Sequence, residues 1–182
     1  MSRHYQSWTT LALTPELLRA LQQQFRDRTT GKTYLALVLG DWPTRLKVID
    51  TPLAKYLIEG AAGDEKRVRT VRSDDPDAMT AVTLVKVLRC LPGFTLLQVT
   101  IKTGRTHQIR VHLAQAGHPI AGDDKYGDFN ANRQLARSTG GTALRRMFLH
   151  AWRLKFAHPQ TGEVIELLSP LPSDLDRFVE KK

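Results

Sequence analysis

Two pairs of apolar-rich segments, each joined by a short turn, place the strongest constraint on how this chain folds. The pairs are residues 80–90 and 94–102, around Leu91-Pro92-Gly93, and residues 148–157 and 164–168, around Pro159-Gln160-Thr161-Gly162. Segments joined by such short turns pair as antiparallel strands. The apolar run KTYLALVL at 32–39 indicates a further, buried strand. The sequence therefore predicts a mixed, mostly antiparallel β-sheet.

Three other segments carry helical signals. Thr14 before Pro15 is typical of a helix start, because a capping hydroxyl is followed by proline at the first helical position. A second helix is predicted over 105–117, where Gly117 supplies the left-handed residue that ends it. A short amphipathic helix is predicted over 173–179. Helices flanking a mostly antiparallel sheet make an α+β fold, and no long linker or internal repeat divides the chain.

Charge narrows the class of partner. The 182 residues carry a formal net charge of +9 and 41% of them are hydrophobic, so the chain is expected to bury a core and to bind a polyanion, nucleic acid before membrane. Charge alone leaves RNA binding at even odds. No apolar run reaches membrane-spanning length and the start lacks a signal-peptide core, so we expect a cytoplasmic protein. The single cysteine, Cys90, lies in a strand and is expected to be a buried, inert thiol.

The sequence disfavours both a metal site and a catalytic pair of aspartates. The histidines at 107, 112 and 118 are five and six residues apart, and those at 150 and 158 are eight apart, with no cysteine or acidic cluster beside them. Such spacing does not place two metal ligands one helical turn apart, so no metal is expected. The pair Asp123-Asp124 follows Gly122, which favours a turn over acid–base chemistry.

The stretch TGRTHQIRVHLAQAGHPIAGDDKYGD at 103–128 closely resembles the third motif of the RluA/RluC-type pseudouridine synthases. Three further stretches resemble the same family: GKTYLALVLGDWP at 31–43, the small-residue and Thr strand at 77–87, and the LHA…HP.TGE hairpin at 146–163. The resemblance runs from about 11 to 178 and is strongest to the RluC branch. It implies an isomerase that converts uridine to pseudouridine in large-subunit ribosomal RNA, as a monomer, without cofactor or metal.

The resemblance assigns catalytic roles to two residues. Tyr34 matches the family's active-site tyrosine, whose ring would hold the detached base; from the residues alone a core tyrosine is favoured. Arg110 matches the arginine that pairs with the catalytic aspartate, and its planar guanidinium suits a bidentate carboxylate contact. From spacing alone, Arg110 is an exposed helix arginine.

Four residues are assigned to substrate binding. Arg105, Thr106 and His107 begin the predicted helix, where free N–H groups and the positive end of the dipole favour a phosphate. Ordinary capping by Thr106 explains the same residues. Leu149 matches the apolar residue that walls the family's pocket, and by itself it is plain core.

The chain departs from the family at its beginning. The 182 residues contain no HRLDxxTSG stretch, the motif that carries the catalytic aspartate, and no S4-type RNA-binding domain. We therefore expect an N-terminally truncated catalytic domain over 11–182, preceded by a poorly ordered, non-family segment over 1–10. Two alternatives to an active enzyme stay open: a catalytically silent RNA-binding remnant of the same fold, and a basic protein whose partner is not RNA.

Overall fold

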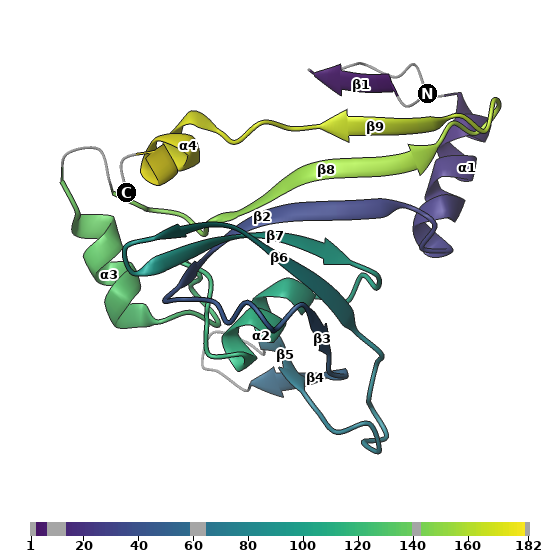
Figure 1. Ribbon diagram of the computed structural model, residues 1–182. Helices are drawn as coiled ribbons and strands as arrows, with labels where there is room; N and C mark the ends of the chain where they lie inside the picture. The colour runs from purple at the N-terminus through teal and green to yellow at the C-terminus, as the bar shows by residue number, and fades with distance from the viewer. Residues whose placement is uncertain (1–2, 7–13, 59–64, 140–142, 181–182) are drawn as a thin grey trace.

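The computed structural model describes residues 3–6, 14–58, 65–139 and 143–180. Within these ranges the chain forms a seven-stranded sheet in the order β1-β9-β8-β2-β7-β6-β3, a two-stranded ribbon β4-β5 and four helices (Figure 1). The strands are β1 (Arg3–Gln6), β2 (Gly31–Leu39), β3 (Val48–Asp50), β4 (Leu53–Ile58), β5 (Glu65–Thr70), β6 (Val82–Leu91), β7 (Phe94–Ile101), β8 (Leu149–Ala157) and β9 (Val164–Leu168). The helices are α1 (Pro15–Arg26), α2 (Gln108–Gln115), α3 (Phe129–Arg137) and α4 (Ser173–Glu180).

The predicted α+β class and both predicted hairpins are confirmed. The β6–β7 and β8–β9 pairs are antiparallel, and β2 pairs antiparallel with both β7 and β8 at the centre of the sheet. Among the described strands, the one parallel pair is β1 with β9, in register from Arg3↔Ile165 to Gln6↔Leu168. Four of the residues expected to be poorly ordered therefore form a strand, and positions 1–2 and 7–10 lie outside the described residues.

Three details differ from the sequence predictions. The helix predicted from 105 begins only at Gln108, because His107 adopts a left-handed conformation with φ 52°. Strands β1, β3, β4 and β5 have no counterpart among the strands predicted above. Cys90 is exposed, not buried, because it lies near the end of β6, where the hairpin reaches solvent.

Alternate side chains of the central strands enter two core clusters. Leu37 of β2, with Leu96 of β7, joins the cluster that contains Phe148 and Phe178. Ala36 and its partner Leu97 join the cluster that holds Ile109 and Leu113 of α2. Successive strand residues point to opposite sides, so the two clusters fix both the register of the sheet and the position of α2.

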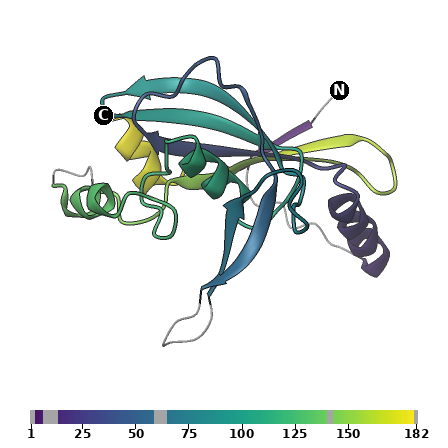
Figure 2. The same cartoon turned by 90° about the horizontal axis from the view of Figure 1, so that it is seen from below.

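The remaining elements lie at the periphery. In Figures 1 and 2 the β4–β5 ribbon projects from the sheet, whereas α1 lies at one end of β8 and β9 and α4 at the other. Thr14 caps α1 through its side chain, as predicted. The amide of Gln24 holds this helix to the β8 end through both backbone groups of Ala157, at 2.8 and 3.0 Å.

A buried polar network ties α2 to β6. The ring of His112 contacts Thr83 Oγ1 through Nδ1 at 2.9 Å and the carbonyl of Thr51 through Nε2 at 2.9 Å. Thr83 also accepts a hydrogen bond from Gln108 Nε2, at 3.0 Å. Because His112 is fully buried, its nitrogens are satisfied only by these partners. Burial lowers the pKa of His112 below its ordinary value.

Stability is expected to fall as the pH falls through the titration of the unfolded histidine. The pKa of His112 in the folded chain lies below the unfolded value of about 6.5, so the unfolded chain binds a proton first as the pH falls. The contribution of neutral His112 to the free energy of unfolding is therefore complete above about pH 6.5 and is lost below it. Urea unfolding at pH about 7.5 and about 5.5 measures this, and the slope is at most about 1.4 kcal/mol per pH unit from this group. A His112→Gln protein that keeps the full pH slope would contradict the assignment.

Candidate active site

The ion pair between Arg110 and Asp123 is the centre of the candidate site. Arg110 lies on α2, and its Nε and Nη2 donate to the two carboxylate oxygens of Asp123 at 2.7 and 2.6 Å. Nη2 also donates to Asp124 at 3.0 Å. The Arg110 side chain is 11% exposed and Asp123 is 1% exposed, whereas Asp124 is 81% exposed. The arginine predicted to be exposed from its spacing is therefore largely buried and has two carboxylate partners.

Asp123 also shapes the loop in which it lies. Its carboxylate accepts hydrogen bonds from the backbone N–H groups of Lys125 and Tyr126, at 2.9 and 3.0 Å. Burial acts to raise the pKa of Asp123, but the bonds from Arg110 and from these two N–H groups outweigh it, so the pKa lies below its usual value. The predicted turn role of Asp123 agrees with these bonds, and its pairing with Arg110 was not foreseen.

Two glycines permit this loop conformation. Gly122 has φ +78°, and a Cβ there would collide with the carbonyl oxygen of Arg146. A Cβ on Gly127 would collide with the carbonyl oxygen of Asp123. Asn132 of α3 closes the loop by accepting from Gly122 N at 2.8 Å and donating to the Asp123 carbonyl at 2.7 Å. The loop is thus fixed against both α3 and the segment before β8.

Tyr126 connects the loop to α2 and β5. Its ring lies 5.1 Å from the guanidinium carbon of Arg110, and its hydroxyl accepts from Val68 N at 3.0 Å. The hydroxyl also lies 3.0 Å from Nδ1 of His107. Burial and then the charges of Arg110 and Lys125 lower the pKa of His107, which favours the neutral ring.

The β4–β5 ribbon supplies the charged rim of the site. Glu65 forms ion pairs with Lys125 and with Arg67, the second at 3.1 Å. Arg67 Nη1 also donates to the carbonyl of Lys125 at 3.2 Å. Hydrogen bonds from Lys125 and then from Arg67 hold the pKa of Glu65 below its ordinary value. The start of β5, next to the turn of the ribbon, is therefore attached to the Asp123 loop by charged contacts.

Tyr34 and Leu149 lie together on the central sheet. Ala36 pairs with Leu149, and Tyr34 lies two residues before Ala36, so both side chains point to the same side of the sheet. Both pack against the core cluster that contains Ile109, the neighbour of Arg110 in α2. Burial raises the pKa of Tyr34, which keeps its hydroxyl protonated at neutral pH. Among the described contacts, no hydrogen bond joins Tyr34 to Arg110.

The predicted phosphate-binding group is only partly assembled. Arg105 and Thr106 precede α2 and do not begin it, and Arg105 Nε donates to the carbonyl of Thr80 at 3.1 Å. Thr106 is exposed, and the cap position of the helix is taken by His107 without a side-chain cap bond. The expected helix start at Arg105 is therefore wrong, because the helix begins at Gln108 with His107 at its cap position.

Neither a metal cluster nor a membrane span appears in the described part of the chain. Its His, Cys, Asp and Glu side chains form no group of three with metal-binding geometry. None of its helices has the length and apolar character needed to cross a bilayer.

Comparison with known proteins now identifies the family. The family model described as RNA pseudouridylate synthase matches residues 10–115, more than half of the chain. The chain belongs to the RNA pseudouridylate synthase family. It is 43% identical over 164 residues to ribosomal large subunit pseudouridine synthase C of Escherichia coli, covering 90% of this chain and 49% of the relative. The Salmonella typhi protein of the same name is 42% identical, with 90% and 48% covered.

Solved structures show the same fold. The human RNA Pseudouridylate Synthase Domain Containing 4 protein superposes with a TM-score of 0.69 at 24% identity, covering 92% of this chain and 68% of that chain. The human Domain Containing 1 protein gives 0.69 at 27% identity, covering 91% and 65%. The chain spans about half the length of the curated relatives it matches.

Sequence reasoning missed two members of the site. Asp123 was assigned to a turn and Tyr126 was given no role, yet both contact Arg110 directly. The signal was present in the stretch GDDKYG at 122–127, in which an aspartate follows the first glycine and a tyrosine precedes the second glycine. A carboxylate that caps its own turn and an arginine thirteen residues earlier are joined only when α2 folds back over the loop.

Asp123 and Asp124 form a matched pair for mutation. Asp123→Asn removes the buried partner of Arg110 and should cost about 3 kcal/mol of unfolding free energy, because a buried charge is left without its counterion. Asp124→Asn removes an exposed partner of the same guanidinium and should cost at most about 1 kcal/mol. Urea denaturation of both proteins decides this, and equal losses would show that burial does not set the strength of the pair.

Proposed function

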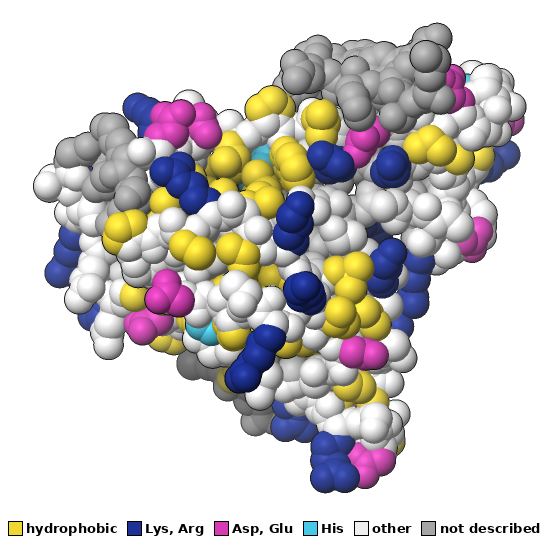
Figure 3. Space-filling view, viewed as in Figure 1, with side chains coloured by type: hydrophobic (Ala, Val, Ile, Leu, Met, Phe, Trp, Pro, Cys, Tyr) yellow, Lys and Arg dark blue, Asp and Glu magenta, His cyan; other side chains and the backbone are white. Residues whose placement is uncertain are grey.

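We propose that this chain is most of the catalytic domain of a pseudouridine synthase, which isomerises uridine to pseudouridine in large-subunit ribosomal RNA once a segment carrying the catalytic aspartate completes it. The observation that carries the proposal is the family match over residues 10–115, with relatives named ribosomal large subunit pseudouridine synthase C. The formal charge of +9 suits a polyanionic substrate. Lys and Arg side chains are spread over the face seen in Figure 3, from the upper edge of the sheet to the β4–β5 ribbon.

The reaction cleaves the N1–C1′ bond of uridine, turns the detached base and rejoins it to the sugar through C5. It needs a place to hold the free base and a pocket poor in water. Tyr34 supports this role, because it is half-buried on the same side of β2 as Leu149 and its phenol stays protonated. We assign the flat face of Tyr34 to the base and Leu149 to the apolar wall beside it.

Arg110 would position a carboxylate against the sugar. Its guanidinium is held rigidly by buried Asp123, whereas its contact to exposed Asp124 is solvent-accessible. A third carboxylate or a phosphate oxygen can therefore replace Asp124 without disturbing the Asp123 pair. In this proposal, Asp123 orients the guanidinium, and Arg105, Thr106 and His107 lie where the adjoining phosphates pass.

A second function, RNA binding without catalysis, is favoured by one observation. The 182 residues contain no HRLDxxTSG motif, so none of their carboxylates matches the aspartate that the resemblance requires. The carboxylates that do contact Arg110 belong to its own loop. In both functions RNA is the partner, and a monomeric, cytoplasmic protein without metal or cofactor remains our expectation.

Activity separates the two functions. The purified 182-residue protein should release no tritium from RNA labelled at uridine C5, because it lacks the matching aspartate. The same chain extended in frame by an HRLD-type segment should show turnover and a higher melting temperature. Turnover by the unextended protein at roughly 1 per second, within tenfold, would point to an unrecognised carboxylate. An extended protein that gains neither activity nor stability would favour the silent binding module.

RNA binding by the 182-residue protein should be strong at low salt and steeply salt-dependent. Each phosphate neutralised by Lys or Arg releases counterions, so affinity should fall several-fold or more between about 50 and 200 mM salt. Fluorescence anisotropy with a labelled stem-loop of large-subunit ribosomal RNA measures it. A flat salt response would remove the RNA-partner proposal.

A further inference from the structure

A cavity of about 400 Å³ lies between α4 and the segment that leads into β8. It is lined by Ala143, Leu144, Arg145, Arg146, Asp174 and Arg177. Three arginines line it beside one carboxylate, which leaves the cavity with an excess of positive charge. None of these residues belongs to the site around Arg110.

The walls of this arginine cavity are held by core contacts. Leu144 is buried, and its N–H donates to the carbonyl of Leu135 in α3 at 3.0 Å. Helix α4 is fixed from its other side by Leu175 and Phe178, both fully buried. Asp174 and Arg177 are three residues apart on α4, so they share the face that borders the cavity. The arginines are therefore presented from elements that do not need to order when a ligand binds.

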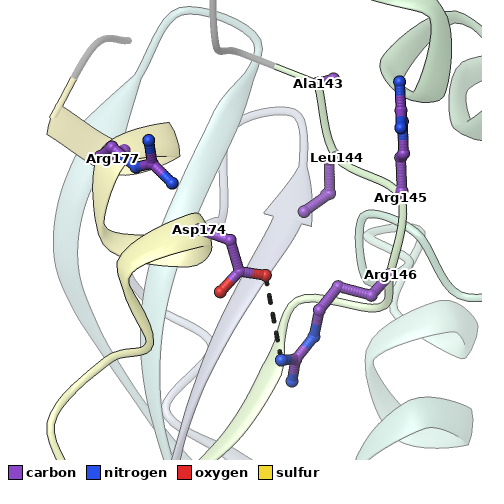
Figure 4. Close-up of a pocket in the computed structure, with 6 residues that line it drawn as sticks. All are labelled: Ala143, Leu144, Arg145, Arg146, Asp174 and Arg177. Carbon is purple, nitrogen blue, oxygen red and sulfur yellow. Dashed lines mark ion pairs between the residues drawn. The ribbon is translucent and has the colours of Figure 1, made fainter.

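The guanidinium groups have hydrogen-bonding capacity to spare. The Arg146–Asp174 pair measures 3.9 Å, longer than a hydrogen bond, with side chains 49% and 52% exposed. Arg177 uses Nε to donate to the carbonyl of Ser173 at 2.9 Å, and the rest of its fork remains for a ligand. In Figure 4 Arg146 points toward Asp174, Arg177 lies on α4 on the other side of Asp174, and Arg145 points away.

We propose that Arg146 and Arg177 form a phosphate-binding site that takes a backbone phosphate of the RNA substrate. The inference rests on the proposed function for its source of phosphate. Two guanidinium groups that line one cavity suit a phosphodiester, because each presents a planar fork of donors. The site is coupled to the candidate active site through the chain itself. The backbone of Arg146 packs on Gly122, directly before Asp123, and Phe148 N donates to the carbonyl of Ala121 at 2.9 Å.

The test compares two double variants with the same loss of charge. Arg146→Gln/Arg177→Gln removes the cavity pair, and Arg19→Gln/Arg26→Gln removes two arginines of α1, at the opposite end of β8 and β9 (Figure 1). Circular dichroism melting first establishes that both fold. The cavity variant should flatten the plot of log affinity against log salt by about 0.7 to 0.9, the share of one phosphate contact. The α1 variant should keep the slope of the unmodified protein.

A third variant should change RNA affinity in the opposite direction. Asp174→Asn removes the carboxylate that competes for Arg146 and should tighten RNA binding several-fold, an effect that a purely structural role would not produce. Equal slopes for the cavity and α1 variants, or weaker binding by Asp174→Asn, would overturn the site while leaving the RNA proposal intact. If the unmodified protein binds no RNA, both proposals fail together.

A separate experiment distinguishes an RNA phosphate from a free phosphate ion as the ligand of the cavity. Titration calorimetry with inorganic phosphate alone should show no more than weak binding, because a single free phosphate lacks the contacts made by the neighbouring nucleotides. Tight phosphate binding that is lost in the cavity variant, together with unchanged RNA affinity, would assign the cavity to a free phosphate ligand and overturn the RNA assignment.

Discussion

The ion pair between Arg110 and Asp123 joins α2 to the loop that follows it, and much of the candidate site depends on that connection. Asp123 is nearly inaccessible to solvent, so its charge requires the guanidinium and the two backbone N–H groups that it accepts. Through Tyr126 the same loop reaches His107 on one side and β5 on the other. Loss of the pair would therefore release three elements together.

Gly122 connects the Asp123 loop to the segment before β8. Because no Cβ intervenes, the backbone of Arg146 lies directly against Gly122, and the segment before β8 is positioned by the loop that holds Arg110. The arginine cavity and the Arg110 site are thus two parts of one framework. A bound RNA that contacts both would be oriented by the phosphate site while the base is held near Tyr34.

Arg110 has one buried and one exposed carboxylate partner, and the two have different roles in the proposed function. Buried Asp123 fixes the guanidinium through Nε and Nη2, and exposed Asp124 accepts a second bond from Nη2. In the proposed function, RNA recognition does not depend on a third carboxylate, since the phosphate contacts and the holding of the base are assigned to other residues. The enzyme and the silent binding module therefore share the same structure here and differ in a residue that these 182 positions do not contain.

The sequence by itself determined the periodic parts of this protein. Alternation in β6–β7 and β8–β9, the turns between them, the Thr14–Pro15 helix start and the end of α2 at Gly117 all follow from local chemistry. Local patterns did not reveal that His107 is left-handed or that Cys90 is exposed. Tertiary structure alone decided that Arg110 meets Asp123, that Tyr126 lies over Arg110, and that Arg146 and Arg177 face one cavity. Those contacts join residues far apart in the chain, and their geometry exists only after the sheet and α2 have packed.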